Sequence, residues 1–324
     1  MGYEDIHFPS NTSFLVTGGA GFIGSNLVEA LLKKGCFVRV LDNFSTGKRK
    51  NIEPFLNNSN FQLIEGDIRD FETCNLACTG IDFILHEAAF GSVPKSIKFP
   101  QLYEEINIKG TLNILVAARD NHVKRVIYAS SSSVYGDNFS LPKKEESIGN
   151  SLSPYALTKR VDELYAKLFT SIYNVETIGL RYFNVFGKNQ DPNSQYSAVI
   201  PKFIKSFLNG VTPTINGDGS YSRDFTYVEN VVEANLKACL ADSTVSGEVF
   251  NIGCGNTITL NNLYSTLSTA LNFTLPPIYG PVRKGDIPHS FADITKAIKY
   301  LDYNPKYSFN DGIALTLEWY KENL

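Results

Sequence analysis

The sequence predicts an α/β protein built on a doubly wound parallel sheet, with a smaller C-terminal lobe that is poorer in regular elements. Three observations lead to this prediction. Apolar runs of strand length alternate with longer amphipathic segments through the first half of the chain, the pattern of a parallel sheet covered by helices on both faces. A glycine-rich turn, TGGAGFIG at 17–24, connects the first apolar run to the first amphipathic segment. From about residue 184 the alternation loosens, and glycine and proline clusters separate shorter elements.

The first predicted strand, 14–16, and the first predicted helix, 25–35, flank the glycine turn. In such a turn Gly18 permits the tight bend, Gly21 lets the backbone approach a pyrophosphate, and Gly24 lets the helix pack on the strand. Free amide N–H groups and the positive end of the helix dipole then face the phosphates. Strand, turn and helix together predict a dinucleotide-binding site.

The second predicted strand, 37–41, is followed by Asp42, which lies 18 residues after Gly24. A carboxylate at this place can bind both hydroxyls of an adenosine ribose and would repel a 2′-phosphate. The expected cofactor is therefore NAD rather than NADP.

Further along the chain, strands are predicted at 61–65, 83–85, 125–129 and 177–180, and helices at 71–78, 102–121 and 154–173. Polar and glycine-bearing stretches follow these strands, at the edge where ligands bind to a parallel sheet. The segment 224–252 contains a further helix and strand pattern and is expected to return to the first lobe. The expected division is an NAD-binding Rossmann domain at 1–183, with that return, and a second lobe at 184–324.

The composition describes an ordinary globular chain, with 43% hydrophobic residues, 19% charged residues and a net charge of −3. The slightly acidic balance gives no electrostatic reason to expect a nucleic-acid partner. No apolar run approaches the ~20 residues that span a bilayer, and the N-terminus lacks a basic-then-apolar signal. We therefore expect a cytoplasmic protein without membrane contact. Cys74 and Cys78 can share a helix face, but no histidine accompanies them, so we expect no metal.

A second stretch with candidate functional residues is SPYALTK at 153–159. Ser153 suits a helix N-cap and Pro154 the first helical position, so Tyr155 and Lys159 lie one turn apart on one helix face. A free tyrosine loses its proton only near pH ~10, but a lysine ammonium and the positive nicotinamide of NAD both favour the phenolate. Such a phenolate can remove a proton from an alcohol while the nicotinamide accepts hydride from the same carbon.

A row of hydroxyls, 130–133, follows the predicted strand at 125–129. Ser131 can hydrogen-bond the reacting hydroxyl and share its proton with the tyrosine. The expected catalytic residues are therefore Ser131, Tyr155 and Lys159.

Over nearly its full length the chain resembles the extended short-chain dehydrogenases/reductases, and among them the UDP-hexose 4-epimerases. The motifs that carry the resemblance occur in family order: TGGAGFIG, DNFSTG, GDIRD, SSSSVYGD, SPYALTK, RYFNVFG, SRDFTYV and RKGDIPHSFAD. The chain is most similar to the bacterial UDP-N-acetylglucosamine 4-epimerases. The resemblance implies an isomerase that interconverts UDP-GlcNAc and UDP-GalNAc by oxidising carbon 4 to a transient ketone and reducing it from the other face. It also implies a homodimer packed through helices 102–121 and 154–173, and a supply of nucleotide sugars for surface polysaccharide.

The resemblance implies roles for individual residues as well. The cofactor-binding positions are Gly18, Gly21, Phe22, Ile23, Gly24, Asp42, Asn43, Ser45, Gly47, Asp67, Ile68, Ala88, Tyr155 and Lys159. The positions that bind the UDP-sugar are Ser92, Ser131, Ser132, Asn184, Val199, Asn216, Arg223, Arg283, Asp286 and Ser290. Asp67 and Ile68 would flank the adenine. Arg223 and Arg283 would clamp the UDP, since guanidinium groups suit a diphosphate, and Asp286 would bind a ribose hydroxyl.

Three positions bear on the subclass. Ser132 and Ser133 stand where the related 4,6-dehydratases carry an Asp–Glu pair, and hydroxyls cannot replace that acid–base pair in expelling water. Ser290 stands where epimerases for UDP-glucose and UDP-galactose tend to carry a tyrosine. The alternatives that stay open are a UDP-glucose/UDP-galactose epimerase, a UDP-glucuronate 4-epimerase and, in a different class, a non-catalytic NAD-binding regulatory protein.

Overall fold

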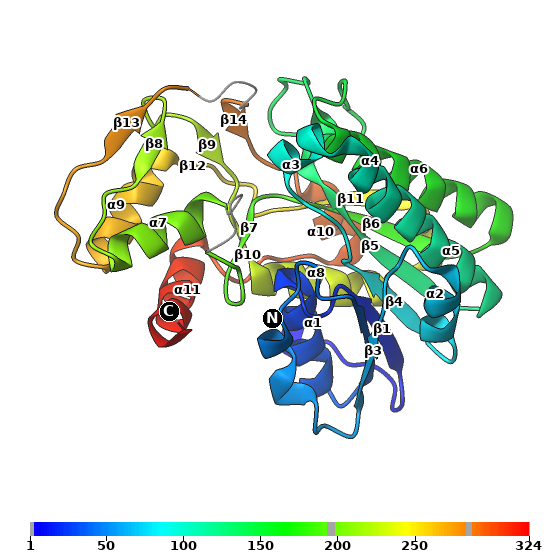
Figure 1. Cartoon of the computed structure of the whole chain (residues 1–324). Coiled ribbons are helices and arrows are strands. Elements are labelled where there is room, and N and C mark those ends of the chain that lie inside the picture. Colours follow the sequence, from blue (N-terminus) through cyan, green and yellow to red (C-terminus); the bar gives the residue numbers. More distant parts are fainter. Residues whose placement is uncertain (1–2, 193–197, 283–286, 324) are drawn as a thin grey trace.

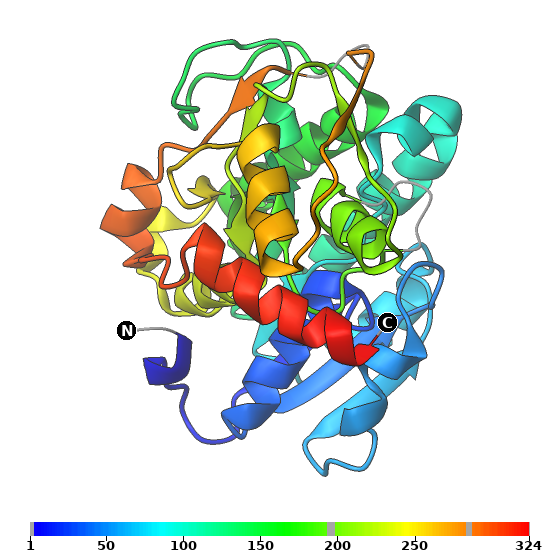
Figure 2. The same ribbon diagram turned by 90° about the vertical axis from the view of Figure 1, so that its left-hand side faces the viewer.

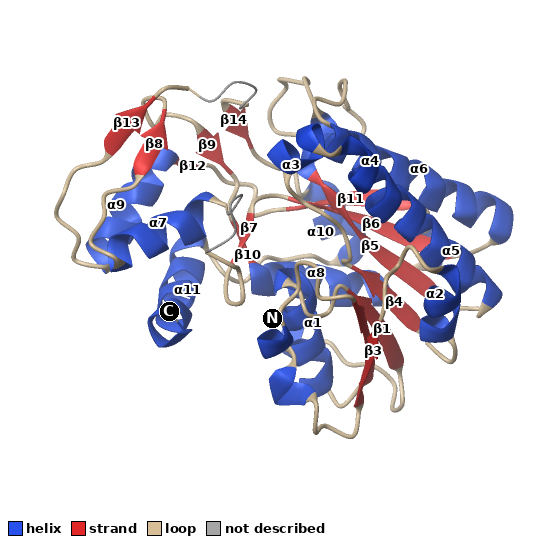
Figure 3. Cartoon of the chain, viewed as in Figure 1, coloured by secondary structure: helices blue, strands red, loops and turns tan. Residues whose placement is uncertain are grey.

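The computed structural model describes residues 3–192, 198–282 and 287–323 (Figure 1). A large lobe surrounds a seven-stranded sheet, and a smaller lobe of short strands and helices lies beside it (Figure 3). The predicted fold class, a doubly wound parallel sheet with a smaller second lobe, is confirmed. No helix in the described part of the chain is long and apolar enough to cross a membrane.

The large sheet has the strand order β11-β6-β5-β4-β1-β2-β3, and every neighbouring pair is parallel. Its strands are β1 (Ser13–Thr17), β2 (Phe37–Asp42), β3 (Phe61–Glu65), β4 (Phe83–His86), β5 (Arg125–Ser131), β6 (Glu176–Tyr182) and β11 (Glu248–Ile252). The chain runs from β1 outward to β3 and then crosses back to β4 on the other side of β1, so the order reverses between β1 and β4. Ligands of such sheets bind at this reversal, beyond the carboxyl ends of the strands.

Helices cover both faces of the sheet (Figure 1). One face carries α1 (Phe22–Lys33), α8 (Val228–Leu240) and α10 (Thr295–Leu301), and the other carries α2 (Phe71–Cys78), α4 (Pro100–Tyr103), α5 (Gly110–Asp120) and α6 (Pro154–Tyr173). Successive strand residues point to opposite faces, so Val16 belongs to the first hydrophobic core and Leu15 to the second. Both faces are covered, which explains why all five residues of β1 are buried and its three central residues are apolar.

The predicted bounds of β3, α2 and α6 agree with the structure. The helix predicted at 25–35 begins earlier, at Phe22, because the extended Gly21 serves as its N-cap. The last glycine of the motif therefore lies inside the first helical turn rather than before it.

The helix predicted at 102–121 is interrupted by a π-helical segment, Glu104–Lys109. Asn107 in this segment is buried, and its amide group donates to Phe90 O at 3.1 Å and to Thr158 Oγ1 at 3.0 Å. It also accepts a hydrogen bond from the Phe90 amide at 2.8 Å. Asn107 thus connects this helix to the loop after β4 and to α6, and π segments are frequent at functional sites.

The smaller lobe is built from α7 (Val199–Leu208), α9 (Leu260–Ala270), α11 (Phe309–Asn323), β8 (Thr214–Asn216), β9 (Ser222–Arg223), β12 (Ile258–Thr259), β13 (Ile278–Gly280) and β14 (His289–Ser290). A parallel pair, β7 (Val185–Phe186) and β10 (Thr226–Tyr227), lies where the two lobes meet (Figure 1). Aromatic and aliphatic side chains of α7, α9 and α11 fill the core of this lobe, and α11 packs against α9 and β10 (Figure 2). The chain then returns to the large lobe twice. β11 pairs with β6, and α10, which no sequence pattern had indicated, packs against β11 and α8.

Candidate active site

A cavity of about 310 Å³ lies at the reversal of strand order, beyond the ends of β1, β2, β3 and β4. The predicted cofactor-binding residues that line it are Gly18, Gly21, Phe22, Ile23, Gly24, Asp42, Asn43, Ser45, Asp67, Ile68 and Ala88. The cavity therefore has the position, the glycine floor and the acidic wall that a dinucleotide requires.

The glycine turn leaves space that a side chain would fill. Gly18 has φ = 68°, and a Cβ on it would lie 2.8 Å from the Ala88 amide nitrogen. A Cβ on Gly24 would overlap the carbonyl oxygen of Gly18. The Gly21 amide donates to Gly18 O at 2.9 Å, which closes the bend. The backbone at the start of α1 is thus accessible to a pyrophosphate, and these residues fit NAD.

Asp42 is fixed between the glycine turn and the loop that follows β2. Its Oδ2 accepts a hydrogen bond from the Ala20 amide at 2.9 Å, and its Oδ1 accepts one from the Phe44 amide at 2.8 Å. Burial raises the pKa of Asp42, and these two N–H groups oppose the rise. Each oxygen retains acceptor capacity for a ribose hydroxyl. Gly47 is not a wall residue of the cavity, and instead it packs against Asp42, where a Cβ would lie 2.9 Å from Oδ2.

Asn43, Ser45 and Asp67 form a connected group at the outer end of the cavity. The Asn43 amide group donates to Asp67 Oδ2 at 2.8 Å, and the Ser45 amide donates to Asn43 Oδ1 at 3.0 Å. Hydrogen bonds from the Arg69 side chain lower the pKa of Asp67 to about 2. Asp67 is therefore ionised and held in place beside Ile68, where adenine binding is predicted.

Ser131 is the last residue of β5, and Tyr155 and Lys159 lie on the first two turns of α6. The helix packs along β5 and along the 3-10 turn that follows it. Ser153 caps the helix as predicted, because its Oγ accepts a hydrogen bond from the Ala156 amide at 3.1 Å. The three expected catalytic residues thus belong to two elements in direct contact, although none of them is a wall residue of the cofactor cavity.

A buried hydrogen bond joins β5 to α6 beside Ser131. The Ser130 hydroxyl donates to Glu163 Oε1 at 2.6 Å. Ser131 Oγ accepts from the Ser133 amide at 3.1 Å and also lies 3.1 Å from Ser133 Oγ. Ser132 begins the 3-10 turn and is partly exposed.

Lys159 is buried, and its Nζ lies 3.3 Å from Asp162 Oδ2. Burial raises the pKa of Asp162 to about 7, and the charge of Lys159 opposes the rise. This carboxylate partner was not predicted from the sequence, although the i, i+3 spacing of Lys159 and Asp162 places both on one face of a predicted helix.

Ser92 is connected to Tyr155 through a second tyrosine. The rings of Tyr155 and Tyr103 meet edge to face, with centroids 6.4 Å apart. The Tyr103 hydroxyl donates to Ser92 O at 2.7 Å and accepts from the Ser92 amide at 3.1 Å. Ser92 also caps α3 (Val93–Lys98), accepting a hydrogen bond from the Lys95 amide.

A second cavity, of about 410 Å³, lies in the smaller lobe. The predicted substrate-binding residues that line it are Asn184, Val199, Asn216 and Arg223. Its walls also include the aromatic side chains of Phe186, Phe203, Tyr221 and Phe225. Phe22 lines the first cavity and packs against the hydrophobic cluster that contains Phe186, a wall residue of the second.

Ser290 lies in β14 directly opposite Arg223 of β9. Its carbonyl oxygen accepts a hydrogen bond from the Asp224 amide at 3.0 Å, and its side chain is half-buried. Ser290 is not a wall residue of either cavity. It lies near the second cavity only because its register partner, Arg223, lines that cavity. Arg283 and Asp286 lie outside the described residues.

Several walls of the cofactor cavity were not predicted as individual site residues: Leu41, Thr46, Gly66, Glu87, Ala89, Phe90, Gly91 and Ile106. A signal existed for the run from Glu87 to Gly91, since it follows β4 directly at the carboxyl edge of the sheet. Ile106 carried no such signal, because it reaches the cavity from the π segment.

Comparison with known proteins agrees with this geometry. The family model described as the NAD dependent epimerase/dehydratase family matches residues 14–253. A putative UDP-glucose 4-epimerase of Methanocaldococcus jannaschii is 37% identical over 311 residues, which are 95% of this chain and 98% of the relative. The solved UDP-N-acetylglucosamine 4-epimerase from Methanobrevibacter ruminantium M1 is 39% identical with a TM-score of 0.92, and the match covers 98% of this chain and 100% of the other. The UDP-glucuronic acid 4-epimerase from Bacillus cereus, solved with UDP-glucuronic acid and NAD, is 32% identical with a TM-score of 0.89, covering 97% and 100%. NAD is the cofactor of this family, and a relative was solved with it bound. This chain belongs to the NAD-dependent epimerase/dehydratase family.

Proposed function

We propose that the protein is a 4-epimerase that interconverts UDP-GlcNAc and UDP-GalNAc. The observation that supports it most is the arrangement of Ser131, Tyr155 and Lys159 on two packed elements, in a chain that also has two cavities suited to its two ligands. The first cavity fits NAD, and the second is lined by Arg223 and by aromatic side chains that suit a uridine diphosphate. Solved relatives named as UDP-sugar 4-epimerases share the fold over almost the whole chain.

In this proposal the bound NAD supplies a hydride acceptor and donor at carbon 4 of the sugar. Tyr155 removes the proton from the 4-hydroxyl and later returns it. The positive charge of Lys159 favours the phenolate, while Ser131 orients the reacting oxygen. Asn184, Val199, Asn216 and Arg223 hold the nucleotide while the keto sugar turns over, and Ser92 and Ser132 contact the sugar.

The preference for N-acetyl sugars rests on Ser290 and on the Methanobrevibacter relative. A small side chain opposite Arg223 leaves room for a 2-acetamido group. Two alternative substrate pairs also have support from relatives. Relatives named as UDP-glucose 4-epimerases favour UDP-glucose and UDP-galactose, and relatives named as UDP-glucuronate epimerases favour UDP-glucuronate and its 4-epimer.

One assay separates these possibilities. The purified full chain is incubated with UDP-GlcNAc, UDP-Glc and UDP-GlcA in turn, and the epimers are resolved by chromatography. We expect the highest kcat/KM for UDP-GlcNAc and UDP-GalNAc. A higher value for either other pair would replace the proposed substrate, and no turnover of any pair would favour a non-catalytic NAD-binding regulatory protein.

The same proposal covers the setting of the enzyme. Residues 1–183 with 224–252 would form the NAD-binding domain, and 184–324 would supply the UDP-sugar lobe. The five cysteines are free thiols, which suits a reducing cytoplasm, where UDP-sugars for surface polysaccharide would be made.

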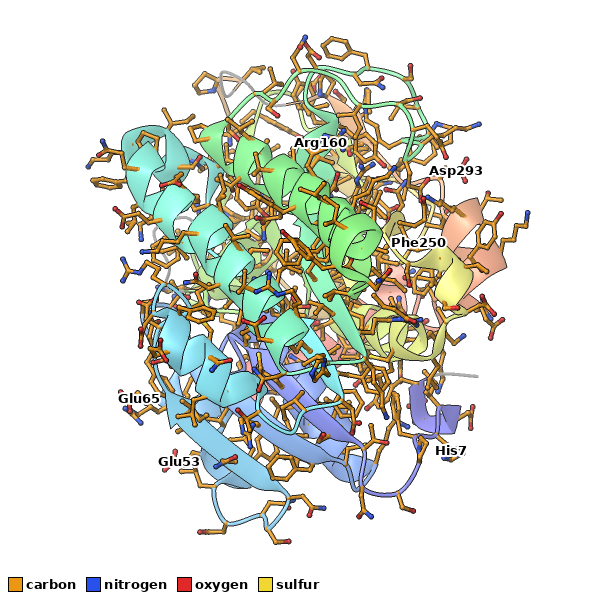
Figure 4. The ribbon with its side chains drawn as sticks, turned by 90° about the vertical axis from the view of Figure 1, so that its right-hand side faces the viewer. His7, Glu53, Glu65, Arg160, Phe250 and Asp293 are labelled. Atoms are coloured by element: carbon orange, nitrogen blue, oxygen red, sulfur yellow. The ribbon has the colours of Figure 1, made fainter. Side chains whose placement is uncertain are left out.

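We also propose that the protein is a homodimer. Four apolar side chains of α6, each between 46% and 59% exposed, recur at helical spacing along one stripe: Leu157, Leu164, Leu168 and Ile172. Figure 4 views the face on which α6 lies beside the helix formed by α4, the π segment and α5. An apolar stripe on a helix of this length suits burial against a second copy of the same face.

A further inference from the structure

Glu87 brings a carboxyl group into the wall of the cofactor cavity. It follows β4 directly, and its amide donates to Thr17 O, at the end of β1, at 3.2 Å. Tyr182, the last residue of β6, donates its hydroxyl to Glu87 Oε1 at 2.6 Å, and the Asn235 amide group donates to the same hydroxyl oxygen at 2.9 Å. Because β5 lies between β4 and β6, the Glu87 side chain is fixed across the carboxyl end of β5.

Different acidic residues line the two ends of the cavity. Asp42 is the last residue of β2 and Asp67 follows β3, and the acid at the end of β2 marks the adenosine half of a bound dinucleotide. Glu87 lies at the opposite end, next to β5. There Ser131 is the register partner of Tyr182, the residue that holds Glu87. Glu87 therefore lies in the part of the cavity that receives the nicotinamide.

Charged and titratable groups face Glu87 from three elements. Burial raises the pKa of Glu87 to about 7, while the Tyr182 hydroxyl of β6 and the Lys159 ammonium of α6 oppose the rise. His86 precedes it on β4, and burial lowers the pKa of that imidazole to about 3, so it is neutral. Asp162 is the partner of Lys159, and its pKa is also about 7. Of these two carboxyl groups and this imidazole, Glu87 and Asp162 change charge near neutral pH.

We propose that the Glu87 carboxylate stabilises the positively charged nicotinamide of NAD⁺ over the neutral ring of NADH, and thereby sets which form of the cofactor this cavity prefers. The carboxylate attracts only the oxidised ring, whereas a protonated Glu87 does not distinguish the two. As pH rises through about 7 the carboxylate forms, so the preference for NAD⁺ increases with pH.

The test measures the dissociation constants of NAD⁺ and NADH for the nucleotide-free full chain by fluorescence titration and competition. For the wild type we expect Kd(NADH)/Kd(NAD⁺) to rise roughly ten-fold between about pH 6 and about pH 8.5. Glu87→Gln should keep Kd(NADH)/Kd(NAD⁺) at the value that the wild type shows at about pH 6, whatever the pH. Calorimetry in two buffers of different ionisation enthalpy should detect proton release when NAD⁺ binds near pH ~7, and no release when NADH binds.

Two further variants test whether the pH dependence of the Kd ratio comes from Glu87 or from a neighbouring group. Asp162→Asn should keep the pH dependence of the ratio. Tyr182→Phe removes a hydrogen bond to the charged form of Glu87 and should move the midpoint to higher pH. The proposal is overturned if Glu87→Gln keeps the wild-type dependence, if Asp162→Asn abolishes it, or if the wild type shows none. Should Glu87→Gln fail to fold, an unmoved midpoint in Tyr182→Phe refutes it. No sugar is present, so the outcome is independent of the proposed substrate.

Discussion

Tyr155 brings one hydroxyl group to the proposed reaction, and its ring is held edge-on by Tyr103. Removing that hydroxyl leaves the ring contact and both cavities intact. We therefore expect Tyr155→Phe to bind NAD and UDP-sugar normally but to lose roughly 10²–10⁴-fold in kcat, the usual range for a general base. Single-turnover kinetics and equilibrium binding of both ligands measure the two effects separately.

A matched control is Tyr173→Phe, at the exposed far end of the same helix, which should keep wild-type turnover. Near-normal kcat in Tyr155→Phe would remove this tyrosine from the mechanism.

Ser290 allows a prediction about sugar size. A tyrosine there would extend from β14 beside Arg223, and the acetamido group must fit in both orientations of the keto sugar. A clash in a packed pocket costs about 1–3 kcal/mol, which corresponds to roughly ten- to hundred-fold in rate. We expect Ser290→Tyr to lower kcat/KM by this factor for UDP-GlcNAc and UDP-GalNAc and to spare UDP-Glc and UDP-Gal. Ser290→Ala should leave both pairs unchanged, and equal losses on both pairs in Ser290→Tyr would mean that Ser290 does not select the sugar.

At the scale of single elements, the turn between β1 and α1 depends on a close approach that only glycine permits. A Cβ on Gly24 would overlap the carbonyl oxygen of Gly18, and backbone atoms cannot yield as a side chain does. Gly24→Ala is therefore expected to lower the free energy of unfolding by about 1–3 kcal/mol and to weaken NAD binding. Urea denaturation and NAD titration test this.

Gly91→Ala is the control, because a Cβ there meets nothing within 4 Å. Its unfolding free energy should match the wild type, and a Gly24→Ala protein of equal stability would contradict the close approach.

Elements with local signals were predictable from the sequence. The start of α6 was predictable because Ser153 and Pro154 are local signals for a helix N-terminus. The glycine turn was predictable for the same reason, since its shape depends on residues that are neighbours in the sequence. The π segment was not predictable, since its wider turn accompanies hydrogen bonds of Asn107 to Phe90 and Thr158, which are distant in sequence. Glu87 and Tyr182 are 95 residues apart and meet only because β4 and β6 flank β5.

On the scale of the whole molecule, both lobes contribute to the proposed site. The large lobe supplies the cofactor cavity and the expected catalytic residues, while the smaller lobe supplies the second cavity. Phe22 links them, since it belongs to the first helix of the large lobe and packs into the core of the smaller one. A change in how the lobes pack should therefore alter both NAD and UDP-sugar binding.

The proposed homodimer gives the last prediction. In a two-fold interface each substitution occurs twice, so Leu164→Glu with Leu168→Glu would place four carboxylates in one buried apolar contact. Losing about 1.5–3 kcal/mol for each buried leucine, before any cost of desolvating charge, should weaken the dimer by more than roughly 10³-fold. Analytical ultracentrifugation should then show the wild type as two chains of 36.0 kDa and the double variant as one. Leu76→Glu, an exposed leucine on α2 outside the stripe, should remain dimeric. A monomeric wild type would refute the homodimer, and a double variant that still sediments as a dimer would place the interface on another face.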